Sequence, residues 1–296
     1  MNWILIAFLE PILFAITNVL DSNLINRLFK NIWALTVFVA VANALFLPII
    51  WLIDSPQLIS LDLLPYIILV AFIDLYYAYP YYKALQNDDT SIAVSLFSLG
   101  KIFVPVLAFF LVGESLHLIQ YSGFILITVS SAALTFNPKA KLKLNRSFFY
   151  MLFASSLLAV EVVIYRYIFN QVSWGTGFFW TTSISALLGL MSLLIPNLWQ
   201  GAKSELSSLK KHYHPILLIG VVGFIGCIGF SYPISQVPAT VSRSISSFQP
   251  FFVLLYAVMF AKHFPLAFRE EVSMLSIGKK LILFVIMTIG IILMVE

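Results

Sequence analysis

The sequence predicts an all-α polytopic membrane protein with ten transmembrane helices, arranged as two inverted five-helix repeats around a central cavity. Three observations predict this fold: the composition, the length of the apolar runs and an internal repeat. Hydrophobic residues make up 61% of the 296 residues and charged residues only 10%, and the mean hydropathy is +0.98. About a quarter of the residues of a soluble domain are charged. So little charge cannot cover a water-facing surface, which excludes a soluble globular enzyme.

Ten apolar runs can be recognised along the chain. A spanning helix needs about 20 mostly apolar residues, and within hydrocarbon the backbone must form its hydrogen bonds inside the helix. Turn-forming and polar stretches such as Asp54-Ser55-Pro56 separate the runs. The first run carries Glu10 and lacks a basic start, so we do not expect a cleaved signal peptide. The predicted spans are residues 2–20, 32–53, 63–83, 91–112, 118–136, 148–169, 177–196, 215–235, 240–261 and 278–295.

The distribution of basic residues predicts the orientation of these spans. Fourteen Lys and Arg residues lie in or beside the odd-numbered loops, whereas two, Arg166 and Arg243, lie toward the opposite side. Cytoplasmic loops of membrane proteins carry an excess of Lys and Arg. We therefore expect the odd-numbered loops in the cytoplasm, both termini outside, and the cell (inner) membrane as the location. The fourteen residues are Arg27, Lys30, Lys83, Lys139, Lys141, Lys143, Arg146, Lys203, Lys210, Lys211, Lys262, Arg269, Lys279 and Lys280.

Two segments that align 149 residues apart indicate an internal repeat. Residues 95–108 match residues 244–257 at positions that include two serines, one valine and one alanine, and each segment falls on the fourth helix of a five-helix half. An odd number of spans in each half forces the halves into opposite orientations, as in many secondary transporters. We therefore expect a first repeat over 1–136, a basic connecting loop over 137–147 and a second repeat over 148–296.

Short motifs in the first half resemble the drug/metabolite transporter superfamily, in its ten-helix EamA-like branch. The motifs are Tyr82-Lys83-Ala84-Leu85 and the end of the fourth helix at Gly113-Glu114. Lys101 departs from the family pattern, which usually has a proline there. The resemblance implies a transporter fold over the whole chain without indicating a substrate. Members of this branch usually place both termini in the cytoplasm, opposite to the charge-based prediction.

Ionisable residues at the centres of the spans are the candidate site residues. Each costs about 2.5–3.5 kcal/mol to insert, so these side chains should face a shared polar interior. Neighbours on the same helical faces join them, because residues three, four and seven apart share a face. The acids and bases of the interior suit a zwitterionic substrate. The predicted substrate-binding residues are Thr17, Asn18, Asp74, Tyr77, Tyr81, Ser98, Lys101, Tyr165, Arg243 and Ser246.

Two acids are predicted to bind a coupling proton. The segment Ala7-Phe8-Leu9-Glu10 resembles the first helix of small multidrug resistance proteins, which implies that Glu10 exchanges protons for substrate. Glu161 is the second candidate, because it lies on the sixth helix, which the repeat relates to the first. Alternatively, Asp74 and Lys101 pair only to hold the helices together. Asp21, Lys83, Glu114 and Arg166 lie at predicted span ends, where we expect them to reach toward water.

These features favour a secondary transporter, more an exporter than an importer, for a small polar and possibly zwitterionic metabolite such as an amino acid or amine. A multidrug or cation efflux transporter is the alternative. An integral-membrane enzyme acting on a lipid-linked substrate is a further one, but Gly229–Pro233 lacks the second glycine of a nucleophile elbow. The single cysteine excludes a disulfide. We expect no enzyme activity, metal, cofactor or nucleic-acid partner; the partners are the bilayer and the substrate, and a homodimer is left open.

Overall fold

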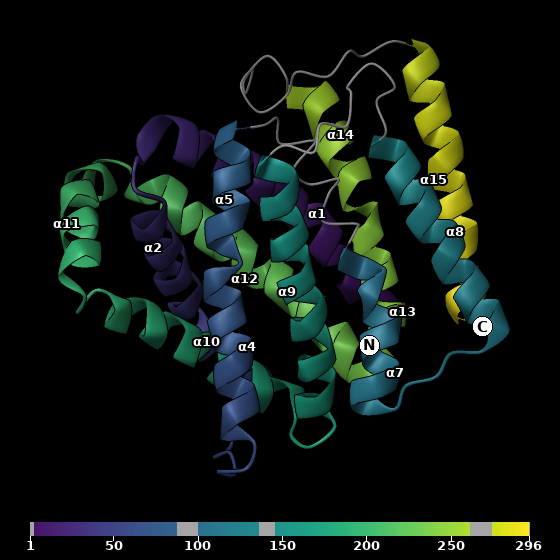
Figure 1. The fold of residues 1–296 in the computed structure, drawn as a ribbon, viewed down its shortest axis with the longest axis horizontal. Helices are drawn as coiled ribbons and strands as arrows, with labels where there is room; N and C mark the ends of the chain where they lie inside the picture. The colour runs from purple at the N-terminus through teal and green to yellow at the C-terminus, as the bar shows by residue number, and fades with distance from the viewer. Residues whose placement is uncertain (1–2, 88–99, 136–145, 261–273, 296) are drawn as a thin grey trace.

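The computed structural model describes residues 3–87, 100–135, 146–260 and 274–295, and all regular structure in these residues is helical (Figure 1). The helices of the first half are α1 (Trp3–Asn23), η1 (Leu24–Leu28), α2 (Ile32–Ala44), η2 (Leu47–Ile49), α3 (Ile50–Ile53), α4 (Leu64–Tyr76), α5 (Ala78–Asn87), α7 (Phe103–Val112) and α8 (Leu118–Thr135). Those of the second half are α9 (Arg146–Phe169), α10 (Trp174–Ser192), α11 (Pro196–Lys211), α12 (Tyr213–Gln236), α13 (Ala239–Ile245), η3 (Ser246–Phe248), α14 (Gln249–Phe260) and α15 (Met274–Val295).

Five described helices are long and apolar enough to cross a membrane, and a sixth is added if α10 and α11 form one bent span. Three shorter apolar helices lie at 103–112, 118–131 and 282–295. The helical, polytopic character therefore agrees with the sequence prediction, whereas the count of ten spans and the inverted halves stay predictions. The five long spans are Trp3–Leu28, Ile32–Ile53, Leu64–Gln86, Arg146–Phe169 and Tyr213–Gln236.

The polar stretch after Pro196, which we expected to be a loop, is the helix α11. It turns by 98° from α10 and lies at the left edge of Figure 1. Pro196 occupies the first turn, where its missing N–H costs nothing. The buried Glu205 carboxylate accepts hydrogen bonds from the N–H groups of Lys30 and Asn31, each at 2.8 Å. The sequence prediction was wrong here because α11 is held by this anchor at the start of α2 and not by apolar content.

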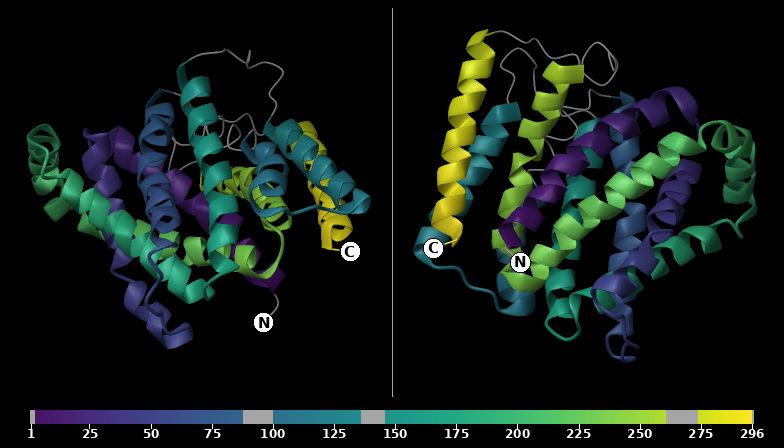
Figure 2. Two further views of the ribbon diagram at one scale, coloured as in Figure 1. Left: turned by 60° about the horizontal axis from the view of Figure 1, so that its bottom comes forward. Right: turned by 180° about the vertical axis from the view of Figure 1, so that it is seen from behind.

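Helix α1 packs along α12 through the middle of the molecule (Figure 2). Glycines on α12 permit this close approach: a Cβ at Gly229 would lie 2.6 Å from the backbone nitrogen of Glu10 and 3.0 Å from the carbonyl oxygen of Ile6. Such distances are shorter than real Cβ contacts, so any larger residue would push the helices apart. The contact fixes Glu10 at the point where α1 meets α12.

A second close pair, α8 and α15, lies at one edge of the molecule (Figures 1 and 2). A Cβ at Gly123 would lie 2.6 Å from the carbonyl oxygen of Gly290. By contrast, a Cβ at Gly278 on α15 would meet nothing within 4 Å. The two glycines of the contact therefore set the distance between helices, whereas Gly278 does not.

We expect Gly123→Ala to destabilise the protein by about 1–3 kcal/mol, because the new methyl group meets backbone that cannot move aside. Thermal unfolding of purified protein in detergent measures the effect. Gly278→Ala is the matched control and should raise stability by about 0.5–1 kcal/mol, since alanine is the better helix former at an open site. Equal midpoints for the two variants would contradict the packing argument.

Candidate substrate cavity

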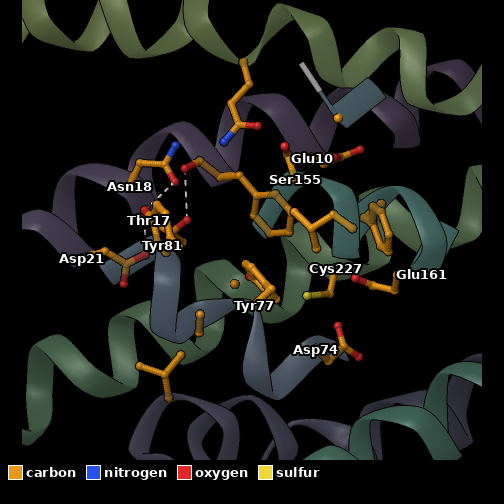
Figure 3. Close-up of a pocket in the computed structure, with 18 of the residues that line it drawn as sticks. Glu10, Thr17, Asn18, Asp21, Asp74, Tyr77, Tyr81, Ser155, Glu161 and Cys227 are labelled. Carbon is orange, nitrogen blue, oxygen red and sulfur yellow. Dashed lines mark hydrogen bonds between the residues drawn. The ribbon is translucent and has the colours of Figure 1, made fainter. Parts of the chain in front are cut away.

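A cavity of about 140 Å³ is lined by residues of α1, α2, α4, α5, α7, α9, α12, α13 and α14 and by the residues just before α7. Apolar and aromatic side chains form part of its lining, and polar groups gather at its two ends (Figure 3). By this measure a single water needs about 10–15 Å³. The space therefore accommodates a molecule of metabolite size.

The cavity brings together nine of the twelve predicted site residues, which come from both halves of the chain. Tyr165 and Ser246 lie behind the wall and bond to acids that line it. Ser98 lies outside the described residues. Their roles in binding stay predictions. The nine residues are Glu10, Thr17, Asn18, Asp74, Tyr77, Tyr81, Lys101, Glu161 and Arg243.

Glu10 forms a buried ion pair with Arg243, which joins α1 to α13. The Arg243 Nη1 donates to Glu10 Oε1 at 2.5 Å, and the Ser246 hydroxyl donates to Glu10 Oε2 at 2.6 Å. The guanidinium carbon also lies 4.9 Å from the centre of the Phe230 ring, a cation–π contact. The Glu10 side chain is 3% exposed, so both of its oxygens are committed to protein groups.

Asp74 and Glu161 lie against each other on α4 and α9. Their carboxyl groups lie within hydrogen-bonding reach of each other, and the Tyr165 hydroxyl donates to Asp74 Oδ2 at 3.4 Å. A carboxylate only accepts hydrogen bonds, so a hydrogen bond between the two acids needs a proton on one of them. The other Glu161 oxygen, Oε2, is buried without a partner.

Lys101 takes a different partner from the one considered in the sequence. Its side chain is buried, and its Nζ donates a hydrogen bond to the Ser247 hydroxyl at 3.4 Å. Asp74 is held by Glu161 and Tyr165 instead. The two residues therefore have separate partners within the described part of the chain.

Asp21 is a cavity residue that the sequence reasoning missed. It is 7% exposed and accepts hydrogen bonds from Tyr82 at 3.1 Å and Tyr81 at 3.3 Å. We expected the first span to end at residue 20, but α1 and η1 continue to Leu28, which places Asp21 inside the helix. The signal was present, because Asp21 lies eleven residues after Glu10 on the same helical face.

Comparison with models of protein families finds one match, in the first half of the chain. The model of the EamA-like transporter family matches residues 1–136. This segment is therefore similar to the EamA-like transporter family. The family lies in the drug/metabolite transporter superfamily, so the match implies a membrane transporter of that type; it does not test the ten-helix branch.

Similarity in fold to a solved structure covers nearly the whole chain. One crystal structure, titled only as that of a protein, superposes with a TM-score of 0.61 over 96% of this chain and 96% of its own. Its sequence is 14% identical, so the likeness concerns the fold alone. No curated protein matches the sequence.

At one end of the molecule, Glu114 and Arg166 form an ion pair, where we expected both side chains to reach toward water. Arg166 Nε donates to Glu114 Oε1 at 2.8 Å, and the N–H of Ala239 donates to Oε2 at 2.9 Å. Arg166 also donates to the carbonyl oxygen of Ile234 at 3.0 Å. Burial raises the pKa of the Glu114 carboxyl above its usual value, while Ala239 and Arg166 oppose that rise. The pair connects α7, α9, α12 and α13.

Three buried polar atoms that face the cavity have no hydrogen-bond partner in the described protein. They are the amide nitrogen Nδ2 of Asn18, the amide oxygen Oδ1 of Asn43 and the carboxyl oxygen Oε2 of Glu161. Buried polar groups are nearly always hydrogen-bonded. The three atoms therefore have unused hydrogen-bonding capacity beside the cavity.

We expect Glu10→Gln to lower the stability of the protein by about 3–5 kcal/mol, because it leaves the Arg243 charge buried without its partner. The double variant Glu10→Gln/Arg243→Gln removes both charges and should recover part of that loss. Thermal unfolding midpoints of the two variants measure the difference. Asp62→Asn, on an exposed loop, is the control for losing a carboxylate. A wild-type midpoint for Glu10→Gln would show that the ion pair contributes nothing.

Proposed function

We propose that the chain is a proton-coupled secondary transporter that exports a small polar metabolite carrying an amine. The charge balance of the cavity carries this proposal. Its described lining holds four acids and two bases; the bases are Lys101 and Arg243, and the acids are Glu10, Asp21, Asp74 and Glu161. With one proton shared between Asp74 and Glu161, an excess of one negative charge remains.

A buried excess charge is costly within the membrane, so the cavity favours an added cation. Either a second proton or the amine of a substrate supplies it. The two then compete for the same negative charge, which gives exchange without any further device. Because the proton gradient across a cell membrane points inward, proton entry drives exit of the amine. A substrate carboxylate, where present, would bind Lys101, the cation of the lining that forms no ion pair among the described residues.

We assign the coupling proton to the Asp74–Glu161 pair rather than to Glu10. Glu10 is held in two hydrogen bonds, one of them from a cation. The acid pair already requires one proton, and Glu161 keeps an unpartnered oxygen toward the cavity. The titratable or charged groups around the pair are Tyr77, Tyr165, Cys227, Glu10 and Arg243.

Glu161→Gln should retain amine binding and lose proton exchange, because its amide imitates the protonated acid. The measurement is amine-induced proton release from proteoliposomes that contain a pH-sensitive dye, over a panel of amino acids and simple amines. Protein-free vesicles correct for weak bases that cross the bilayer unaided, and Asp62→Asn is the control variant. We expect at least a tenfold loss of release in Glu161→Gln. Unchanged release in Glu161→Gln would reject the assignment of the coupling proton to this pair.

We also propose that the basic end of the molecule faces the cytoplasm of the cell (inner) membrane. Lys210 is exposed on α11, and its charge belongs to the excess that predicts this orientation. In a Cys227→Ser background, Lys210→Cys should react with a membrane-impermeant maleimide only after cells are permeabilised. Labelling from outside intact cells would reverse the orientation.

A further inference from the structure

We propose that the Asp21 end of the cavity is a second cation-binding subsite, so that the transported molecule is elongated and carries an amine at each end. This inference rests on the proposed function and makes its substrate class more specific. The first subsite is the Asp74–Glu161 pair. The second consists of Asp21 with its neighbours Asn18, Tyr81 and Tyr82.

Asp21 has no cationic partner in the described protein. Both of its oxygens accept hydrogen bonds from tyrosine hydroxyls, which are neutral. The two ion pairs among the described residues use other acids, Glu10 and Glu114. An ionised carboxylate also has about four positions that can accept a hydrogen bond, of which two remain here. Asp21 therefore lines the cavity with unused acceptor capacity and an unmatched charge.

The hydrogen bonds at Tyr81 provide the second, independent observation. Its hydroxyl oxygen lies 3.0 Å from Asn18 Oδ1 and 3.3 Å from Asp21 Oδ2. A hydroxyl has one proton, so it cannot donate to both of these acceptors. If the Asn18 amide is turned end over end, Nδ2 donates to Tyr81 and Tyr81 donates to Asp21.

This arrangement satisfies Asn18 Nδ2, which otherwise has no partner, and leaves the amide oxygen as the unpartnered atom. Asn18 is 4% exposed and lines the cavity. Every unpartnered atom facing the cavity is then an acceptor, namely the oxygens of Asn18, Asn43 and Glu161. Acceptors at both ends of the cavity favour a ligand with N–H donors at both of its ends. An ammonium group supplies three such donors.

The two subsites are well separated. Figure 3 shows Asn18, Asp21 and Tyr81 on one side of the cavity and Asp74 and Glu161 on the other, with Tyr77 between them. Asp74 and Tyr81 are seven residues apart on consecutive helices, which corresponds to about 10 Å at 1.5 Å per residue.

Tyr77 lies between the subsites, and Phe14 adds a further aromatic ring to the lining of the cavity. Such a lining suits the methylene chain of a linear molecule, and its ring faces attract a passing ammonium. A compact amine reaches one subsite only, whereas a long diamine reaches both.

The test compares two probes of equal length, 1,8-diaminooctane and 8-aminooctan-1-ol, which differ in the charge at one end. Binding is measured by ligand-induced thermal stabilisation of purified protein. We expect the diamine to bind at least about tenfold more tightly, as one additional charged hydrogen-bonded group implies. Asp21→Asn should remove this advantage and leave the amino alcohol unchanged, whereas Asp62→Asn should preserve it.

A length series in the wild-type protein, from 1,2-diaminoethane to 1,10-diaminodecane, keeps the proposal testable if Asp21→Asn does not fold. We expect 1,2-diaminoethane to bind no better than a monoamine and affinity to rise once both subsites are spanned. Equal binding of diamine and amino alcohol, or equal weakening of both by Asp21→Asn, would overturn the second subsite. Monoamine-driven proton release without a diamine advantage also overturns it and leaves the proposed function intact. A diamine advantage without proton release supports the subsite and rejects coupled transport.

Discussion

The buried ion pair between Glu10 and Arg243 is the constraint around which the rest of the structure is arranged. A guanidinium within a membrane protein needs a counter-charge, and here the counter-charge comes from the other half of the chain. Gly229 brings α12 against the backbone of Glu10, which sets the acid at a defined depth. The pair, the Ser246 hydroxyl and the Phe230 ring then close one end of the cavity.

The end of the bundle with the α7–α8, α9–α10 and α12–α13 connections is closed by polar contacts independent of this pair. Glu114 and Arg166 tie four helices together there. The loop before α4 joins them, because Asp54 accepts from the N–H of Gly175 at 2.6 Å and Gln57 accepts from Trp180 at 2.8 Å. For the cavity to open toward this end, these charged and polar contacts must exchange partners. These contacts therefore oppose opening of the cavity at this end.

Much of the fold follows from the sequence because apolar length and the cost of buried charge act locally. Helices are found over the ranges of the predicted spans wherever the structure describes the chain, and Asp74, Lys101 and Glu161 face one interior. Which buried side chains contact each other could not be predicted in the same way. Whether Asp74 meets Lys101 or Glu161 depends on the rotation and tilt of three helices, which periodicity does not determine. Likewise, α11 depends on one distant contact of Glu205, and the inward position of Asp21 depends on two further turns of helix.

The same geometry distinguishes the surroundings of the two acids that the sequence offers for proton coupling, Glu10 and Glu161. A proton-coupling acid must lose its proton to substrate and regain it, so its ionised form cannot be permanently satisfied by the protein. In this structure a guanidinium and a hydroxyl hold the two oxygens of Glu10, which favours the acid pair for this role. The Asp74–Glu161 pair meets this condition, because two carboxyl groups in contact favour one proton between them and leave an oxygen toward the cavity. Glu10 thus joins α1 to α13 through Arg243, whereas Glu161 keeps one oxygen without a protein partner.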